Sequence, residues 1–466
     1  MDVLLAVLIV FGVLLSWNLA RKKEEEQFAG EWIPAGRALR LTFDHFHSGG
    51  PALVGKRLGF DVVVSIQTRS EGEDAVEYTC ATASLNRRLK AISLAQETGG
   101  SHLKKVVFGE DILTGDARFD DRVLVGGPAQ AALAVLNQEA RSRVMALVED
   151  GRGEVEDGLV SVRLRGRVMD IATLEQLVAE VAGVASALTP RDFDFPQALA
   201  RNAGADGLPQ VRMRNLEKLL SAFPQSEPAR EAAARALAEP DARLRLRAAM
   251  ALSGSSEALP VLAALVGDPS AETGLRLDAL RTLASGWPYR EVSPSVAAAL
   301  GSGEEPLQRE ALSLLGHEKD LSLYEQAVQL GSRSSDALAC QLARTLGQLG
   351  DARAQRALLL LLSRSASEVK AAAAAALGEV GTVEAVEALL PLSRGLLKGG
   401  EVKEAAREAI RAIQGRIAGA GAGHVSLAAT AAESGAVSLA APAGAVSLSE
   451  AEGTAAPGGR REPAEG

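Results

Sequence analysis

The chain has 466 residues, of which 47% are hydrophobic and 3% aromatic, and its formal net charge is −9. This length suffices for two or three domains, the apolar content excludes wholesale disorder, and the acidic balance argues against a nucleic-acid-binding protein. The two cysteines, Cys80 and Cys340, lie far apart, which excludes a disulfide scaffold and a cysteine-built zinc site.

Residues 3–20 carry no charged side chain, and as a helix they would span roughly 27 Å, the thickness of a hydrocarbon core. A cleaved signal peptide is the alternative, but Asp2 precedes the run and residues 18–20 form a poor cleavage site. We therefore expect a transmembrane anchor over residues 1–23. Its last three residues are cationic, so the positive-inside rule places the N-terminus outside and the bulk of the chain in the cytoplasm. This arrangement describes a single-pass protein of the inner membrane.

Residues 30–190 alternate short strand-like runs with glycine-containing turns, and they predict an α+β domain. Helices are expected over 128–148 and 171–188. The dipeptide Asp157-Gly158 predicts a tight hairpin turn between the last two strands. The expected strands cover residues 39–43, 60–66, 76–84, 103–108, 119–125, 153–156 and 159–165.

The most specific string of this domain is GEDILTGDARFDDRVLVG, at residues 109–126. It resembles the D-I-x-T-G-D-x-x-F-D-x-x-F-x-V-x-G pattern of an uncharacterised domain found in bacterial membrane-anchored proteins. The resemblance covers residues 35–190, although Val123 stands where that family usually places an aromatic residue. It implies a membrane-proximal location and supplies no chemistry.

Five carboxylates lie close together in this string, but their spacing lacks the rhythm of an EF-hand loop. They are Glu110, Asp111, Asp116, Asp120 and Asp121. We favour a structural role over a cation site: Asp116 caps a turn, Gly115 takes a positive φ, and Phe119 fills the core. His45 and His47 could in principle chelate zinc from one strand face, but an exposed strand end is the preferred interpretation. Cys80 reads as a small buried residue.

An internal repeat of 31 to 33 residues follows the α+β domain. Each copy carries three apolar residues at i, i+4 and i+8, which lie on one stripe of a helix. The first residues are Leu244, Leu275, Leu307, Leu338, Val369 and Val402; the second are Ala248, Ala279, Ala311, Leu342, Ala373 and Ala406; the third are Leu252, Leu283, Leu315, Leu346, Leu377 and Ile410. Shorter apolar helices are expected between the copies at 257–266, 294–300, 321–330, 354–363 and 384–391. Stacked helical hairpins of this kind form an α-solenoid, here expected over residues 213–417, with a capping pair at 213–238.

These units resemble HEAT repeats of the short bacterial kind, also called phycobilisome-lyase-type repeats. The clearest copy runs from Glu368 to Gly381 and reads EVKAAAAAALGEVG. The resemblance covers residues 225–415 and implies a protein-binding scaffold. Some relatives act in chromophore attachment, but that activity depends on residues outside the shared pattern.

One repeat position favours cations, which are Arg245, Arg276, Lys370 and Lys403. A cationic ridge could receive an acidic partner, but we favour the alternative, in which these side chains are solvated and cover the helix seam. Gln308 and Ala339 interrupt the row at its middle. Cys340, next to Ala339, is expected to pack rather than to react.

Residues 191–212 are expected to be a linker, and residues 418–466 are expected to be a disordered tail rich in Ala, Gly and Ser. Three tail segments repeat Val-Ser-Leu, starting at residues 425, 437 and 446. Such islands could add a strand to the sheet edge of a partner, or they could be drift in a low-complexity segment.

The sequence therefore predicts a multi-domain protein: a single transmembrane helix, an α+β domain, a HEAT-like solenoid and a disordered tail. The preferred function is a membrane-anchored adaptor with a protein partner on the solenoid. We predict no catalytic, cofactor or metal site, no small-molecule substrate and no nucleic-acid partner, because no nucleophile motif, phosphate loop or zinc motif is present. A lipid- or envelope-binding module is the first alternative, through Arg87, Arg88, Lys90, Lys104 and Lys105. An enzyme with its site in residues 30–190 is the second.

Overall fold

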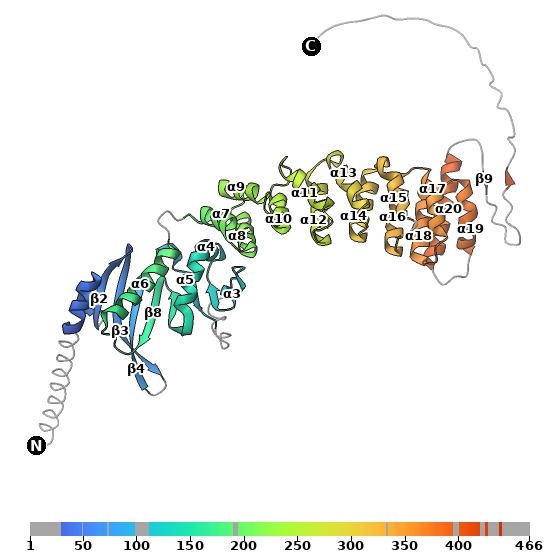
Figure 1. The fold of residues 1–466 in the computed structure, drawn as a ribbon. Coiled ribbons are helices and arrows are strands. Elements are labelled where there is room, and N and C mark those ends of the chain that lie inside the picture. Colours follow the sequence, from blue (N-terminus) through green and yellow to red (C-terminus); the bar gives the residue numbers. More distant parts are fainter. Residues whose placement is uncertain are drawn as a thin grey trace, which may run out of the picture. The chain divides into compact units, whose positions relative to one another are not determined.

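The computed structural model describes residues 29–48, 50–71, 74–97, 111–189, 194–331, 334–394 and 400–419, and two short strands in the tail (Figure 1). The expected anchor at 3–20, the expected strand at 103–108 and most of the tail lie outside the described residues. The chain divides into two compact units, Met1–Val292 and Ser293–Gly466.

An eight-stranded antiparallel sheet, in the order β1-β2-β3-β4-β8-β7-β5-β6, forms the first part of the first unit. The expected hairpin is confirmed: Glu156 pairs with Leu159, and both turn residues, Asp157 and Gly158, have positive φ. This is the geometry that a two-residue hairpin requires. The strands are β1 (Thr42–His47), β2 (Gly50–Arg57), β3 (Phe60–Glu71), β4 (Asp74–Ser84), β5 (Ser93–Gln96), β6 (Val123–Gly126), β7 (Gly153–Glu156) and β8 (Leu159–Arg165).

Helices cover one face of this sheet and bury its apolar side chains. They are a helix over residues 29–39, α4 (Ala129–Val135), α5 (Gln138–Val148) and α6 (Ile171–Leu188). Figure 1 shows α5 and α6 crossing the strands, and alternate strand residues such as Val62, Val64 and Val162 join Leu177 of α6 in one buried core. This in-and-out alternation is expected where only one face of a sheet is covered.

Among the described residues, α6 is the one helix long and apolar enough to cross a membrane, with a mean hydropathy of 1.4. Half of it is buried, and Leu174, Leu177 and Val181 pack in the core of the sheet domain. The packing against the sheet accounts for its apolar composition.

Several predicted boundaries were wrong in this domain. The predicted helix 128–148 is interrupted at Leu136 and Asn137, where Asn137 caps α5 by accepting a hydrogen bond from Ala140 N. The predicted strand at 119–125 begins instead as the short helix α3 (Ala117–Asp120), and β2 and β5 were not predicted. The predicted linker at 191–212 contains all of α7 (Phe195–Ala205) and the start of α8 (Pro209–Ala222), because Asp194 caps α7 and apolar side chains such as Leu199 are buried against α8 and α9.

The first unit continues with five further helices, of which α8 and α9 are the expected capping pair. They are α8, α9 (Glu227–Ala236), α10 (Ala242–Ala251), α11 (Ala258–Gly267) and α12 (Thr273–Gly286). Adjacent helices pack on one another from α7 to α12. The predicted helix at 257–266 corresponds to α11.

The second unit is built of helical hairpins. Its helices are α13 (Tyr289–Leu300, from Ser293 onward), α14 (Glu305–Glu318), α15 (Tyr324–Leu330), α16 (Asp336–Leu349), α17 (Ala354–Leu362), α18 (Ser367–Val380), α19 (Val383–Arg394) and α20 (Gly400–Gly419). Helices α14, α16, α18 and α20 pack side by side in that order (Figure 1). The predicted repeat is confirmed in both units, since all of its stripe residues are buried except Leu252 and Leu275, which are half-buried.

Glycine at one repeat position lets these helices approach closely. A Cβ on Gly347 would lie 3.0 Å from Ala376 Cβ, and a Cβ on Gly378 would lie 3.1 Å from Ala409 Cα. Both glycines directly follow the third stripe residue, so the repeat specifies close packing as well as an apolar seam. In the tail, β9 (Val425–Ser426) pairs with β10 (Ser438–Leu439), which joins the first two Val-Ser-Leu segments.

Candidate functional site: the α14–α20 groove

Three carboxylates of the sequence motif, those of Asp111, Asp116 and Asp120, are engaged in holding its loop. Asp120 accepts hydrogen bonds from the Thr114 backbone N, the Thr114 hydroxyl and the Gly115 N, at 2.7 to 2.9 Å. Asp111 accepts one from Val125 N at 3.0 Å. The expected structural roles are confirmed: Asp116 caps α3, Gly115 has a φ of +91°, and Phe119 is fully buried.

A buried arginine joins this motif to the helices that follow. Arg141 of α5 donates from Nε to Asp116 at 3.0 Å, and from Nη1 and Nη2 to the two carboxylate oxygens of Asp206 at 2.9 and 3.2 Å. The side chains of Arg141 and Asp206 are both only 2% exposed. Burial opposes the charge of Arg141, but the hydrogen bonds to Asp206 and Asp116 outweigh it and hold the pKa of the guanidinium above its ordinary value.

Two further contacts strengthen the same junction. Asn202 of α7 donates to the backbone oxygens of Leu133 and Ala134 at 3.0 and 3.2 Å. A Cβ on Gly115 would lie 2.8 Å from the backbone of Gln210, at the start of α8. The motif therefore fixes the α+β domain on α7 and α8 through Gly115 and Asp116.

Asp120 also borders an open groove of about 460 Å³, together with Asp241 and Arg243 of the helical part. A polar pocket at Asp116 and Asp120 would have favoured an enzyme. The oxygens of both carboxylates already accept hydrogen bonds, as their expected structural roles require.

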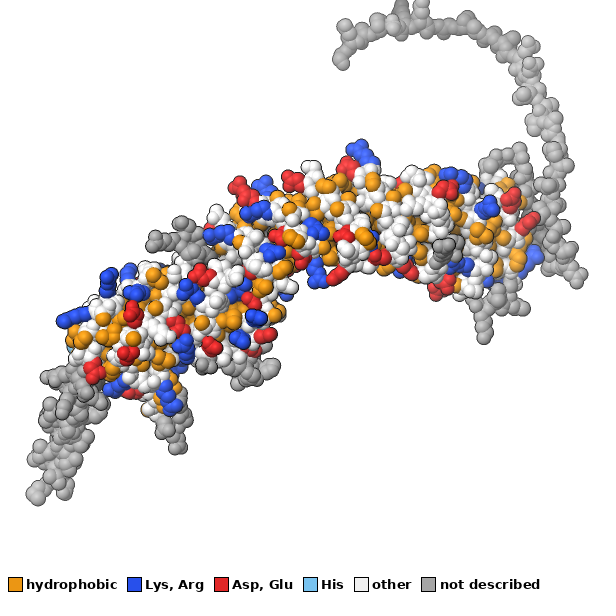
Figure 2. Space-filling model, viewed as in Figure 1, with side chains coloured by type: hydrophobic (Ala, Val, Ile, Leu, Met, Phe, Trp, Pro, Cys, Tyr) orange, Lys and Arg blue, Asp and Glu red, His pale blue; other side chains and the backbone are white. Residues whose placement is uncertain are grey.

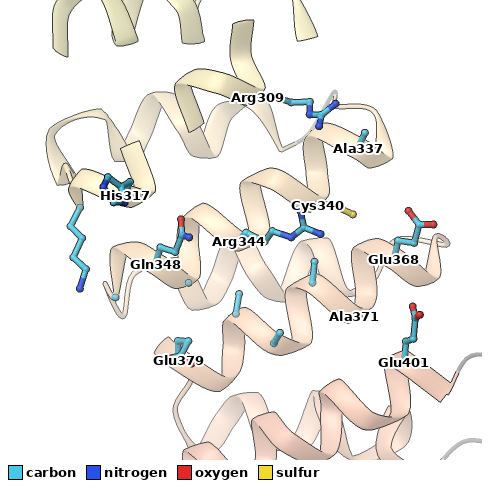
Figure 3. Close-up of a pocket in the computed structure, with 17 residues that line it drawn as sticks. Arg309, His317, Ala337, Cys340, Arg344, Gln348, Glu368, Ala371, Glu379 and Glu401 are labelled. Carbon is cyan, nitrogen blue, oxygen red and sulfur yellow. The ribbon is translucent and has the colours of Figure 1, made fainter. Parts of the chain in front are cut away.

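A large hollow lies in the second unit, across the exposed faces of α14, α16, α18 and α20 (Figure 3). We call it the α14–α20 groove, and its volume is about 1100 Å³. Its floor is made of alanines of α18, which are Ala371, Ala372, Ala375 and Ala376. The groove exists because α18 presents methyl groups where the neighbouring helices present long charged side chains.

The sign of the charges around the floor differs from one helix to another. Arg309 of α14 and Arg344 of α16 line one side, and Glu368 and Glu379 of α18 and Glu401 of α20 line the other. Figure 3 shows Arg344 extending beside Cys340, with Glu368 and Glu401 together at one end of the groove. All five side chains are exposed, and none has an ion-pair partner among the residues that the structure describes. The groove thus offers charges of both signs to an external surface.

The repeat itself produces this division. His317, Gln348 and Glu379 occupy one repeat position on three successive helices, 31 residues apart, and all three line the groove. The side chain at this position therefore changes from an imidazole through a neutral amide to a carboxylate along the row. Variation at an exposed position of a constant scaffold is how repeat proteins acquire a specific surface.

Cys340 lies at the groove wall with 8% exposure, and burial raises the pKa of its thiol. A raised pKa means that little thiolate is present at neutral pH, so Cys340 is a packing residue, as expected. Cys80 is 2% exposed in β4, and burial raises the pKa of its thiol as well, which confirms the expected small buried residue.

At two of the four cationic repeat positions the side chains cover the helix seam. Arg276 is buried, with 3% exposure, and donates to Val266 O at 3.0 Å. Arg245 donates to the backbone oxygens of Glu239 and Pro240.

At the same repeat position Gln308 donates to Leu300 O at 3.1 Å. These side chains cover the seam and satisfy carbonyl groups at or just beyond the end of the preceding helix, which leaves Arg276 unavailable to a partner. Lys370 of α18 and Lys403 of α20 are half-buried and do not line the groove, so their partner role stays a prediction.

The two histidines of the expected strand end lie on β1. His45 stacks edge-to-face on Phe43 at 4.7 Å, and His47 Nδ1 lies 3.5 Å from Asp44. The groove and the Arg141 junction were both missed by sequence reasoning. A signal for the groove was present in the six consecutive alanines of residues 371–376.

Residues 324–412, from α15 into α20, match the family of HEAT repeats. The expected HEAT-like repeats are therefore confirmed over this range, which contains most of the groove. HEAT repeats are consistent with a protein-interaction solenoid. No curated protein matches the chain.

Three solved structures are similar to parts of the chain. One is the complex of CpcE and CpcF of phycocyanin lyase from Nostoc, with 22% identity, a TM-score of 0.28, and coverage of 40% of this chain and 77% of that chain. Another is human deoxyhypusine hydroxylase in complex with glycerol, with 18% identity, a TM-score of 0.23, and coverage of 47% and 96%. The third is an engineered protein, with 18% identity, a TM-score of 0.30, and coverage of 61% and 83%.

Proposed function

We propose that this protein is a membrane-tethered scaffold that docks a partner protein in the α14–α20 groove and carries out no reaction of its own. The observation that carries the proposal is the set of exposed charges of both signs around an alanine floor, in a groove that lies mostly within the region that matches HEAT repeats. Complementary charges steer encounter and fix orientation, and a small-residue floor lets a partner side chain or helix approach closely.

The partner that fits this groove has acidic side chains facing Arg309 and Arg344 and basic side chains facing Glu368 and Glu401. A partner of uniform sign would meet repulsion at one side of the groove, and like-charge contacts are an effective means of rejecting wrong partners. The groove therefore supports a partner surface of mixed charge.

The tether is the uncharged segment at residues 3–20, followed by three cations. We place the N-terminus outside the inner membrane and both compact units in the cytoplasm, because cationic residues are retained on the cytoplasmic side. A docked partner would then be held near the bilayer, which raises its local concentration there.

Site-specific photo-crosslinking in cells that make the full chain tests the proposal. A photoreactive residue is placed at Gln348, in the groove, or at Leu360, which is 69% exposed on α17 and does not line it. We expect one discrete protein adduct from position 348 and none from position 360.

The second part of the experiment measures how the crosslinked adduct depends on the groove charges. Arg344→Glu should abolish it, whereas Arg356→Glu, a matched change of an exposed cation on α17, should leave it intact. Absence of an adduct at 348, equal adducts at both positions, or equal effects of the two charge reversals would contradict the proposal.

A further inference from the structure

One end of the sheet carries a cluster of exposed cations. The pairing register brings the β2–β3 turn, the end of β4 and the β7–β8 turn to this same end, since Arg57 pairs with Phe60, Val62 with Ala83, and Ser84 with Leu159. The short 3₁₀ turn that follows β4 stays there as well: Leu85 N donates to Gly158 O at 2.7 Å. With strands ~4.8 Å apart, the stretch from β2 to β7 covers roughly 20 Å.

We call this region the sheet-end surface, and its cations come from three segments of the chain. They are Arg40, Lys56, Arg57, Arg87, Arg88 and Lys90. Figure 2 shows Lys and Arg side chains gathered over the part of the sheet where β2 is labelled in Figure 1.

Ion pairing leaves most of these cations available. Lys56 lies 3.5 Å from Asp61, and Arg57 lies 3.7 Å from Glu175. Arg40, Arg87, Arg88 and Lys90 have no ion-pair partner among the residues that the structure describes. Glu156 and Asp157 of the β7–β8 turn contribute carboxylates at the same end.

The apex of the β2–β3 turn carries an exposed leucine in an unfavourable backbone conformation. Leu58 has a φ of +52° and Gly59 a φ of +89°, and Leu58 is 63% exposed. The β7–β8 turn has the same geometry, but it places Asp157 at the corresponding position, with a φ of +53°. Asp and Asn tolerate this conformation, whereas a bulky side chain is strained in it. A strained and exposed apolar residue at a turn, between cations, indicates that the side chain is used.

We propose that the sheet-end surface contacts an anionic lipid bilayer, with Leu58 inserted at the headgroup boundary and the surrounding cations on lipid phosphates. Apolar insertion beside cations is the combination that binds such membranes, and each cation near the surface adds to the attraction. The contact rests on the proposed tether, which would make a weak interaction sufficient because the domain never leaves the membrane.

The described chain begins close in sequence to the proposed tether and reaches the sheet-end surface through one helix. Eight residues separate the apolar segment 3–20 from residue 29, the first described residue of the helix over residues 29–39. The helix over residues 29–39 is ~16 Å long and ends beside the sheet-end surface, since Arg40 O lies 3.5 Å from the position of a Cβ on Gly55.

The test uses the full chain in lipid nanodiscs, with an environment-sensitive NBD fluorophore on Leu58→Cys. Cys80 and Cys340 are buried and their thiol pKa values are raised, so the exposed thiol at position 58 is labelled first. Leu360→Cys, at 69% exposure, is the matched control. The discs contain phosphatidylcholine alone or phosphatidylcholine with phosphatidylglycerol.

We expect a several-fold, blue-shifted rise in NBD emission at position 58 in the anionic discs only, with quenching by spin-labelled lipid. Position 360 should report water in both discs. Reversal of Arg87, Arg88 and Lys90 to Glu should remove the signal, and 1 M salt should weaken it because the Debye length falls from ~10 Å to ~3 Å.

Three other outcomes would each contradict a defined part of the proposal. Water-like emission at position 58 in a chain that co-elutes with anionic discs refutes the sheet-end contact and leaves the tether intact. Equal emission in both lipids refutes the role of the cations. A chain that fails to co-elute with either disc refutes the tether and, with it, the contact that rests on it.

Discussion

The buried Arg141 junction makes the strongest stability prediction. Arg141→Met removes the one guanidinium that pairs with both Asp116 and Asp206, and it leaves the Asp206 carboxylate 2% exposed without a cation. Removing one partner of a buried ion pair costs ~3–5 kcal/mol, because the remaining charge is neither solvated nor paired. We therefore expect the free energy of unfolding of the first unit to fall by this amount.

Arg143→Met is the matched control on the same helix. Arg143 pairs with Glu139 at 3.0 Å, but its side chain is 48% exposed, so its loss should cost ~0.5 kcal/mol or less. Urea denaturation of the full chain in detergent, followed by circular dichroism, measures both. The triple change Arg141→Met, Asp116→Asn and Asp206→Leu should recover most of the loss, since it removes the buried charges together.

An Arg141→Met variant within ~1 kcal/mol of the Arg143→Met variant would refute this reasoning, because it would mean that water reaches the carboxylates or that they are protonated when unpaired.

Three further predictions concern single sites. Burial raises the pKa of Glu180 above its ordinary value of 4.5, against the effect of Arg152, so the unfolded chain ionises first and ionisation destabilises the fold. Glu180→Gln should therefore raise the melting temperature at pH 7, with a difference from the wild type that closes as the pH falls below 4.5. Gly347→Val would place its Cβ 3.0 Å from Ala376 Cβ and should lower the unfolding free energy of the second unit by ~1–3 kcal/mol, measured by urea denaturation. Leu58→Asn should raise the unfolding free energy of the first unit by ~1 kcal/mol, because Asn tolerates a positive φ.

Each of these has a contrary outcome. A melting temperature of Glu180→Gln below wild type at pH 7 would mean that the ion pair with Arg152 outweighs burial. Gly415→Ala is the control for Gly347→Val: nothing lies within 4 Å of its Cβ position, so it should be neutral or stabilising. A destabilised Leu58→Asn would show that the leucine packs against the domain.

The elements that were predicted correctly are those with a strong local signal. Strands 153–156 and 159–165 match β7 and β8 because Asp157-Gly158 can hardly form anything but a tight turn. The solenoid helices follow from a three-residue stripe that recurs at fixed spacing, so each copy supports the others. By contrast, β2 begins with Gly-Pro and ends in cations, and its strand character comes from pairing with β1 and β3.

The site features were missed because they are tertiary. Arg141 and Asp206 are 65 residues apart, and neither lies in a sequence motif that predicts their ion pair. Arg276 occupies a repeat position at which cations recur, and its long side chain crosses the helix seam to donate to Val266 O. The groove depends on what neighbouring helices present on each side of Ala375, which repeat periodicity alone does not reveal.

The central claim is that a partner docks in the α14–α20 groove, and its most direct measurement is the dissociation constant of the crosslinked partner for the purified full chain. We predict that Arg344→Glu weakens binding at least ~10-fold, about 1.4 kcal/mol, while Arg356→Glu leaves it unchanged. Equal affinities for the wild type and the Arg344→Glu variant would contradict the account.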